Sequence, residues 1–258
     1  MKKTLLTSAL LLSISLPAQA GDPWPSREEQ AVQPPVQQIQ QTQQVQPMET
    51  VMPDAMSPMD QDISELQEEW ARIKYQISDK DRQLDAIHKL EEQAATVTAK
   101  YPTNAEPKIW EGIILSTDAG IVKGMSALGK VKKAKELFET SLKQNPDALD
   151  GSAYTSLGSL YYQVPGWPIA FGDDEEAEKN LKQALRLNPN GIDPNFFYGD
   201  FLLQDGRYKE AQSYLNKALQ APERPNRPLA DAGRKQEIKA ALAQVGQKLN
   251  DESKPQYN

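Results

Sequence analysis

The sequence contains no cysteine and only one histidine, His88, among its 258 residues. Without cysteine the chain cannot form a disulfide, a zinc-finger cluster or a catalytic thiol, and a single histidine excludes a multi-histidine metal site. No nucleophile–base pair, phosphate-binding loop or paired-acid site occurs at a usable spacing. His88 stands beside Lys89 and Glu91 in a strongly polar segment, which indicates a solvated surface residue. We therefore expect a protein that is not an enzyme and that uses no cofactor or metal.

An excess of basic residues is also missing. The formal net charge is −7, and loss of the amino-terminal segment discussed next would leave 27 basic and 36 acidic side chains, a net charge of −9. Proteins that bind nucleic acids need a basic surface that neutralises phosphates. The charge therefore argues against a nucleic-acid partner.

Long apolar runs are scarce, and the main one lies at the amino terminus. Residues 1–20 begin with two lysines after Met1, continue with an apolar core over residues 5–16 and end in Ala18-Gln19-Ala20. This small-x-small ending is the pattern that signal peptidase cleaves, so we predict a signal peptide with cleavage after Ala20. The core is shorter than the roughly 18 apolar residues that a membrane anchor needs, and no cysteine follows it for lipidation. We expect the mature protein to be released into a bacterial periplasm without a membrane anchor.

Two segments are predicted to be disordered. Residues 21–60 contain nine Gln and seven Pro, a composition that does not support a packed core. The stretch 37–41, which is almost entirely Gln, is either a solvated spacer, which we favour, or a segment that binds a partner. Residues 251–258 form the second segment, a polar tail. The folded domain is expected to cover residues 61–250.

Residues 61–250 carry a repeated helical pattern. Apolar residues recur every three or four positions and no alternating strand pattern appears, which predicts an all-α domain. Three segments place a small residue, a large apolar residue and a second small residue at i, i+4 and i+7, on one face of a helix, and a proline then ends the helix. The three sets are Ala134, Phe138, Ser141 and Pro146; Ala177, Leu181, Ala184 and Pro189; and Ala211, Leu215, Ala218 and Pro222.

A partner helix precedes each of these segments and carries a glycine that we interpret as a packing notch. The clearest examples are Gly158, flanked by Leu157 and Tyr161, and Gly199 in the next unit. Trp110 occupies the corresponding place one unit earlier, and residues 70–90 give a weaker version at the start. Ala177 and Ala211 are 34 residues apart, which is the tetratricopeptide period.

With these residues, the region 62–222 resembles the tetratricopeptide repeat family. The resemblance implies a right-handed α-solenoid of about four helix pairs. Such a stack needs a cap at its last pair, and residues 230–249 are predicted to be the C-terminal capping helix. Ile238, Leu242, Val245 and Leu249 form its apolar stripe, and charged residues such as Arg234 lie mostly off the stripe.

A second resemblance covers just over half of the chain, from Trp110 to Ala241. It rests on Trp110-Glu111-Gly112, Leu157-Gly158-Ser159-Leu160-Tyr161-Tyr162, Gly166-Trp167-Pro168, Phe171-Gly172-Asp173 and Ala230-Asp231-Ala232-Gly233-Arg234. These segments look like the periplasmic T-component of tripartite ATP-independent periplasmic (TRAP) transporters. The resemblance implies self-association, a cleft for a small apolar or carboxylate ligand, and docking to the soluble binding protein of a transporter. Members are often lipid-anchored, and this chain lacks the cysteine that such an anchor needs.

In the tetratricopeptide family the first helix of each pair lines a concave groove. We therefore expect a partner or ligand to contact residues from the second, third and fourth pairs and from an aromatic loop in the third pair. The predicted residues are Lys108, Trp110, Glu111, Thr155, Ser159, Tyr162, Trp167, Phe171, Phe196, Asp200 and Leu203. Their mixture of polar and apolar side chains suits a peptide or a small organic acid.

Seven residues are inserted in the third pair, and they fall in the loop 164–172. Trp167 and Phe171 in this loop either fill the gap between helix pairs or line a ligand pocket. The acidic run 173–176 is expected to cap the next helix rather than bind a metal. In the linker 222–228 we favour arginines that pair with acids such as Asp231 over a carboxylate or phosphate clamp.

The primary hypothesis is a non-catalytic periplasmic adaptor that binds a protein or peptide partner through its groove. A carrier of a small apolar or carboxylate ligand is the first alternative. A scaffold for envelope assembly, in which the Gln/Pro-rich segment reaches a second partner, is a further alternative that the sequence does not separate from the adaptor.

Overall fold

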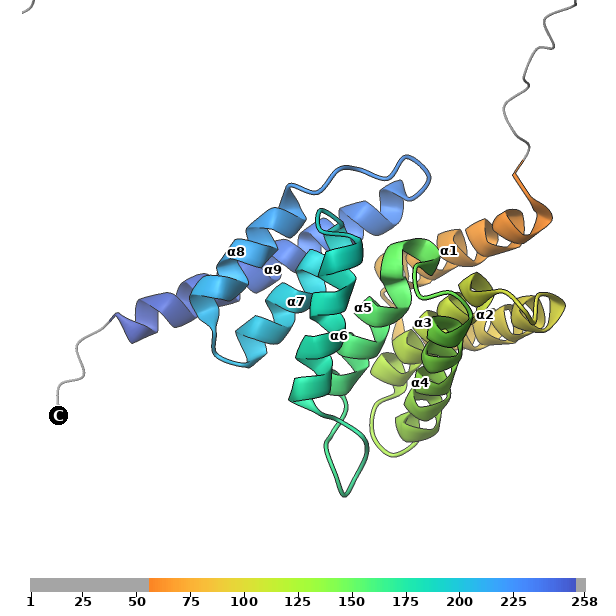
Figure 1. Ribbon diagram of the computed structural model, residues 1–258, viewed down its shortest axis with the longest axis horizontal. Helices are drawn as coiled ribbons and strands as arrows, with labels where there is room; N and C mark the ends of the chain where they lie inside the picture. The colour runs from red at the N-terminus through yellow and green to blue at the C-terminus, as the bar shows by residue number, and fades with distance from the viewer. Residues whose placement is uncertain (1–55, 254–258) are drawn as a thin grey trace, which may run out of the picture. The chain divides into compact units, whose positions relative to one another are not determined.

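The computed structural model describes residues 56–253, which form an all-α fold (Figure 1). Its helices are α1 (Pro58–Gln76), α2 (Lys80–Lys100), α3 (Ala105–Val122), α4 (Ala127–Gln144), α5 (Ala148–Gln163), α6 (Asp174–Leu187), α7 (Ile192–Gln204), α8 (Tyr208–Leu219) and α9 (Pro228–Glu252). The described residues contain no strand, only a bridge between Gly166 and Gly172. The predicted signal peptide, most of the predicted Gln/Pro-rich segment and the tail from residue 254 lie outside the described residues.

The ends of the helices follow local sequence signals. Helix α1 starts at Pro58, three residues before the predicted domain start, because the Ser57 side chain accepts a hydrogen bond from the Asp60 amide (3.1 Å) and proline suits the first helical turn. At the other end of the domain, α9 continues to Glu252, two residues past the predicted end. The prolines of the repeated template follow the ends of α4, α6 and α8, as predicted.

Glycines on the first helix of a pair meet large apolar side chains on the second helix. A Cβ atom added at Gly158 would lie 2.7 Å from Leu181 Cγ, and the other pairs show the same close approach. Phe138, Leu181 and Leu215 are fully buried in these notches. The pairs are Gly112 with Phe138, Gly158 with Leu181, and Gly199 with Leu215. The predicted packing notch is therefore confirmed, and it fixes the antiparallel pairs α3–α4, α5–α6 and α7–α8.

The pairs then stack in chain order into an α-solenoid of four pairs, with α2 against α3, α4 against α5 and α6 against α7. The small residues of the template lie between neighbours: Ala134, Ala177, Ala184, Ala211 and Ala218 have no exposed surface. Small side chains at these positions let adjacent helices approach closely, and the large residue between them fills the remaining space.

Helix α9 caps the stack, and it also reaches the opposite end of the solenoid. Ile238 and Val245 are fully buried against α7 and α8, which confirms the predicted stripe. The first part of α9 contacts α1, and a Cβ atom at Gly233 would lie 2.4 Å from the Tyr75 ring. Arg234 is buried rather than on the outer side, so its predicted position is wrong. The reason is that α9 has a neighbour on both faces.

Membrane spans were sought among the described helices, and none is long and apolar enough to be one.

Candidate functional site

A cavity of about 490 Å³ lies between the first helices of the four pairs and α9. Helices α1, α3, α5, α7 and α9 each contribute to its wall. Aromatic rings and polar groups alternate around it: Trp70, Trp110, Phe196 and Phe197 supply apolar surface, and Thr155, Ser156, Ser159, Asp200, Arg227 and Arg234 supply polar atoms. The size is within the range of small-molecule and short-peptide sites.

Five of the eleven predicted groove residues line this cavity: Trp110, Thr155, Ser159, Phe196 and Asp200. Thr155 and Ser159 are one helical turn apart on α5, and Phe196 and Asp200 are one turn apart on α7. Residues at i and i+4 face the same side of a helix, so each pair points into the cavity together. The role of these residues in binding stays a prediction.

Four other predicted residues have structural contacts outside the cavity. The Lys108 ammonium donates to the carbonyl oxygens of Pro102 (2.5 Å) and Asn104 (3.0 Å), which braces the loop before α3. Glu111 pairs with Lys133 on α4 (2.6 Å). The remaining two are also held by α7: Tyr162 donates its hydroxyl to Asp200 (2.8 Å), and Leu203 packs in the core around α7 and α8.

The aromatic loop separates the last two predicted residues. Phe171 packs edge-on against Tyr161, with ring centroids 5.7 Å apart, so it fills the space beside α4 and α5. Trp167 is 89% exposed and lines none of the cavity. The expectation that Trp167 fills a gap or lines this pocket is therefore wrong, because the inserted loop carries its tip away from the helices.

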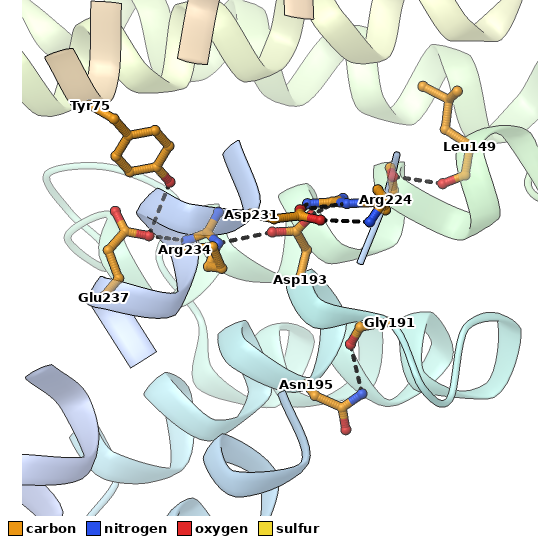
Figure 2. Close-up of polar contacts among 10 residues, drawn as sticks. Tyr75, Leu149, Gly191, Asp193, Asn195, Arg224, Asp231, Arg234 and Glu237 are labelled. Carbon is orange, nitrogen blue, oxygen red and sulfur yellow. Dashed lines mark hydrogen bonds and ion pairs between the residues drawn. The ribbon is translucent and has the colours of Figure 1, made fainter. Parts of the chain in front are cut away.

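An ion-pair network joins α7, the linker before α9, and α9 itself (Figure 2). Asp193 lies between two arginines, with Oδ1 2.9 Å from Arg234 Nε and Oδ2 2.8 Å from Arg224 Nη1. Arg224 also donates to Asp231 through its backbone amide and Nε, both at 2.8 Å, which confirms the predicted Arg–Asp pairing. Although burial alone would raise the pKa of Asp193, the charges of Arg234 and Arg224 hold it well below its usual value.

The same network continues to α1 through Glu237. This carboxylate lies 2.5 Å from Arg234 Nη1 and 3.0 Å from Lys74 Nζ, and it accepts the Tyr75 hydroxyl at 3.3 Å (Figure 2). Burial lowers the pKa of Lys74 to about 8, with a further contribution from Arg234. The network therefore ties the first helix to the last and forms one charged side of the cavity.

Arg227 differs from the other arginines near the cavity because it has no ion pair among the described residues. Its guanidinium lies 4.9 Å from the centroid of the Trp110 ring, and its Nε is buried without a hydrogen-bond partner. Burial and the nearby Arg224 lower the pKa of Arg227 to about 10, so it is cationic at neutral pH. The Trp110 indole Nε1 is likewise buried without an acceptor. The cavity therefore has two unsatisfied donor groups and suits an anionic or acceptor-rich ligand.

Sequence reasoning missed the part of the site that α1 and α9 supply. Trp70, Lys74, Arg227 and Glu237 line the cavity, yet none was predicted there. The concentration of arginine in the linker was the one available signal, and the clamp interpretation that would have used it was not favoured.

The two other polar features have structural contacts. Asp173 caps α6 by accepting hydrogen bonds from the amides of Glu175 and Glu176 (both 3.0 Å), which confirms the predicted capping role of the acidic run. His88 is about half exposed, but its Nε2 lies 3.1 Å from the fully buried Asp118, so it is more than a solvated surface residue. Within the described residues no group of three potential ligands could hold a metal ion.

Comparison with known families bears on the helix pairs just described. Residues 169–245 match the family model described as tetratricopeptide repeat. The matched tetratricopeptide region begins in the inserted loop and extends through α6, α7 and α8 into α9. A solved structure of PilF from Pseudomonas aeruginosa is similar over 76% of this chain and 94% of that chain, at 14% sequence identity and a TM-score of 0.31. No curated protein gives a significant match.

Proposed function

We propose that this chain is a non-catalytic adaptor of a bacterial periplasm that binds a protein or peptide partner in the groove of its tetratricopeptide-type stack. The observation that carries the proposal is the convergence of one side of α1, α3, α5 and α7 on a single cavity of mixed polarity. A stack of helix pairs presents a continuous surface of this kind to an extended or helical segment.

The position of α9 defines which part of a partner can enter. Arg227, Arg234 and Glu237 of the linker and α9 form one wall, and α9 contacts α1 beyond them. The space left is short, so we infer that the groove receives a chain end or a few side chains rather than a long helix.

A photo-crosslinking amino acid placed in the groove tests this proposal in living cells of the source organism. Gln163 is suited to the replacement because it is exposed and lines the cavity, and Lys217, exposed on the outer helix α8, is the control position. We expect a reproducible polypeptide adduct from position 163 and none from position 217, and Ser156→Arg should remove the adduct by filling the groove. Equal adducts at both positions, or an adduct that survives Ser156→Arg, would contradict groove binding.

The compartment is tested separately. Osmotic shock should release the protein together with periplasmic markers, and the purified chain should have lost its first 20 residues. A protein that fractionates with cytoplasmic markers would contradict the proposed location while leaving groove binding open to the crosslinking test.

A second candidate function is a carrier of a small carboxylate, as the resemblance to the TRAP T-component implies, with docking to a transport component. The unpaired Arg227 guanidinium beside Trp110 favours it, because a carboxylate would satisfy the arginine while an apolar body packs on the indole rings.

Phenylacetate and its uncharged amide, phenylacetamide, discriminate this candidate. We expect phenylacetate to quench tryptophan emission through Trp70 and Trp110, and the amide to have little effect. Arg227→Gln should abolish the response, and Arg186→Gln, on the outside of α6, should not. Equal responses to the acid and the amide would count against a carboxylate carrier without bearing on a polypeptide partner.

A further inference from the structure

Most of the exposed large apolar side chains lie on two loops at one end of the solenoid. Met125 is 80% exposed in the α3–α4 loop, and Trp167 and Ile169 are 89% and 59% exposed in the α5–α6 loop. Both loops join the two helices of a pair, and Figure 1 shows them projecting at the same end of neighbouring pairs. The residue that remains, Met56, lies before α1 and far from these loops in the sequence.

A furrow of about 450 Å³ lies between the two loops. Met125 and Ile169 stand on its sides, and Leu128, Val131 and Leu160 contribute apolar surface within it. Lys123 is the one charged residue that lines it. The patch therefore combines a hollow with an adjacent projection, the Trp167 side chain.

The projection is held in place by its own loop. The Gly172 amide donates to the Pro165 carbonyl (3.0 Å), and the Asp173 amide donates to the Tyr161 carbonyl (2.9 Å), which closes the base of the loop. A Cβ atom at Gly172 would lie 1.9 Å from the Val164 carbonyl oxygen, so this tight base requires glycine. Phe171 anchors the loop against Tyr161. Trp167 is thus presented to solvent on a fixed support, which lowers the ordering entropy that binding would otherwise cost.

We propose that this patch binds the same patch of a second copy of the chain. A twofold interface requires a self-complementary surface, on which each copy offers what the other receives. Here a single patch carries both an apolar projection, Trp167, and an apolar furrow. The charges are complementary in the same way, because Lys123 borders the furrow while Asp174 and Glu175 are exposed at the end of the Trp167 loop. Tryptophan is enriched among the residues that dominate interface energies.

The interface is separate from the proposed groove function. Trp167, Ile169 and Met125 do not line the groove cavity, and Ser156 does not line the furrow. Loss of dimerisation and loss of groove binding are therefore distinguishable in the same preparation.

Sedimentation velocity of the full mature chain over a range of concentrations tests the proposal. We expect a monomer–dimer equilibrium in the parent protein, weakened by at least about thirty-fold in Trp167→Ser, as for the loss of an interface hot spot. Met56→Ser, which removes an exposed apolar side chain elsewhere, and Ser156→Arg, which alters the groove, should dimerise like the parent. Circular dichroism should show that all variants keep the parent helix content and Tm.

A chain without cysteine also allows a positional test. When Met125→Cys and Ile169→Cys proteins are mixed, we expect oxidation to give disulfide-linked dimers, whereas Lys217→Cys protein should remain monomeric. A parent protein that stays monomeric at high concentration, a Trp167→Ser protein that dimerises as well as the parent, or crosslinking from position 217 alone would each overturn the proposal.

Discussion

At the scale of single residues, the glycine notches decide how closely the two helices of a pair approach. A methyl group added at Gly158 would overlap Leu181 Cγ (2.7 Å) and approach the Ala177 carbonyl oxygen (3.1 Å), and the backbone atom cannot move aside easily. We expect Gly158→Ala to lower the free energy of unfolding by about 1–3 kcal/mol, because overpacking forces the helices apart. Urea unfolding followed by circular dichroism measures the change.

The matched control uses a helical glycine that has open space around it. No atom lies within 4 Å of a Cβ built at Gly129 in α4 or Gly246 in α9. There the same substitution should stabilise the protein by roughly 0.5–1 kcal/mol, since alanine favours the helix. If Gly158→Ala and Gly129→Ala shift the unfolding midpoint in the same direction, the notch does not control the pairing.

These notches were predictable from the sequence because the constraint repeats along the chain. Gly158 and Gly199 each precede a small–large–small template at a regular distance, and a repeated pattern can be recognised without knowing the fold. Arg227 and Lys74 carry no repeated pattern. Their places in the cavity follow from where α9 ends up, which is a tertiary contact between segments more than 150 residues apart in the case of Tyr75 and Glu237.

At the scale of elements, the Asp193 network holds α9 and its linker against α7. The folded-state pKa of Asp193 lies below the unfolded value of about 3.9. A carboxylate whose pKa is lowered by folding contributes stability that is fully present above its unfolded pKa and is lost as the pH falls toward its folded pKa. We therefore expect the parent protein to lose stability below about pH 4, by roughly 1–3 kcal/mol from this group.

Asp193→Asn isolates that contribution. The variant should be less stable than the parent at pH 6, because Arg224 and Arg234 lose a buried anion, and the difference should shrink toward pH 3. Asp147→Asn, which changes an exposed carboxylate outside the network, should follow the parent at every pH. Guanidinium is unsuitable because it screens ion pairs, so urea unfolding at each pH is the appropriate measurement. A difference between Asp193→Asn and the parent that does not vary with pH would contradict the assigned role.

At the scale of the whole described domain, the contact between α1 and α9 changes how the stack is stabilised. Repeat proteins are held by neighbour contacts alone, so their terminal pairs can unfold separately. Here Gly233 abuts the Tyr75 ring and Glu237 binds both Lys74 and Tyr75, which joins the first pair to the cap across the cavity. We therefore expect cooperative loss of the two ends, rather than fraying from α1.

Gly233→Leu tests this coupling, because the side chain would clash with Tyr75 while facing away from the α9 residues buried against α8. We expect hydrogen exchange to speed up in α1 and α2 by at least about tenfold, an opening free energy lowered by about 1.4 kcal/mol, with little change in α5 and α6. The cavity loses a wall when α1 separates, so crosslinking from position 163 should fall as well. Gly246→Leu, at a position with open space in the same helix, provides the control. Faster exchange confined to α8 and α9 would instead mean that the substitution only loosens the cap, and that α1 is held by α2 and α3 without help from α9.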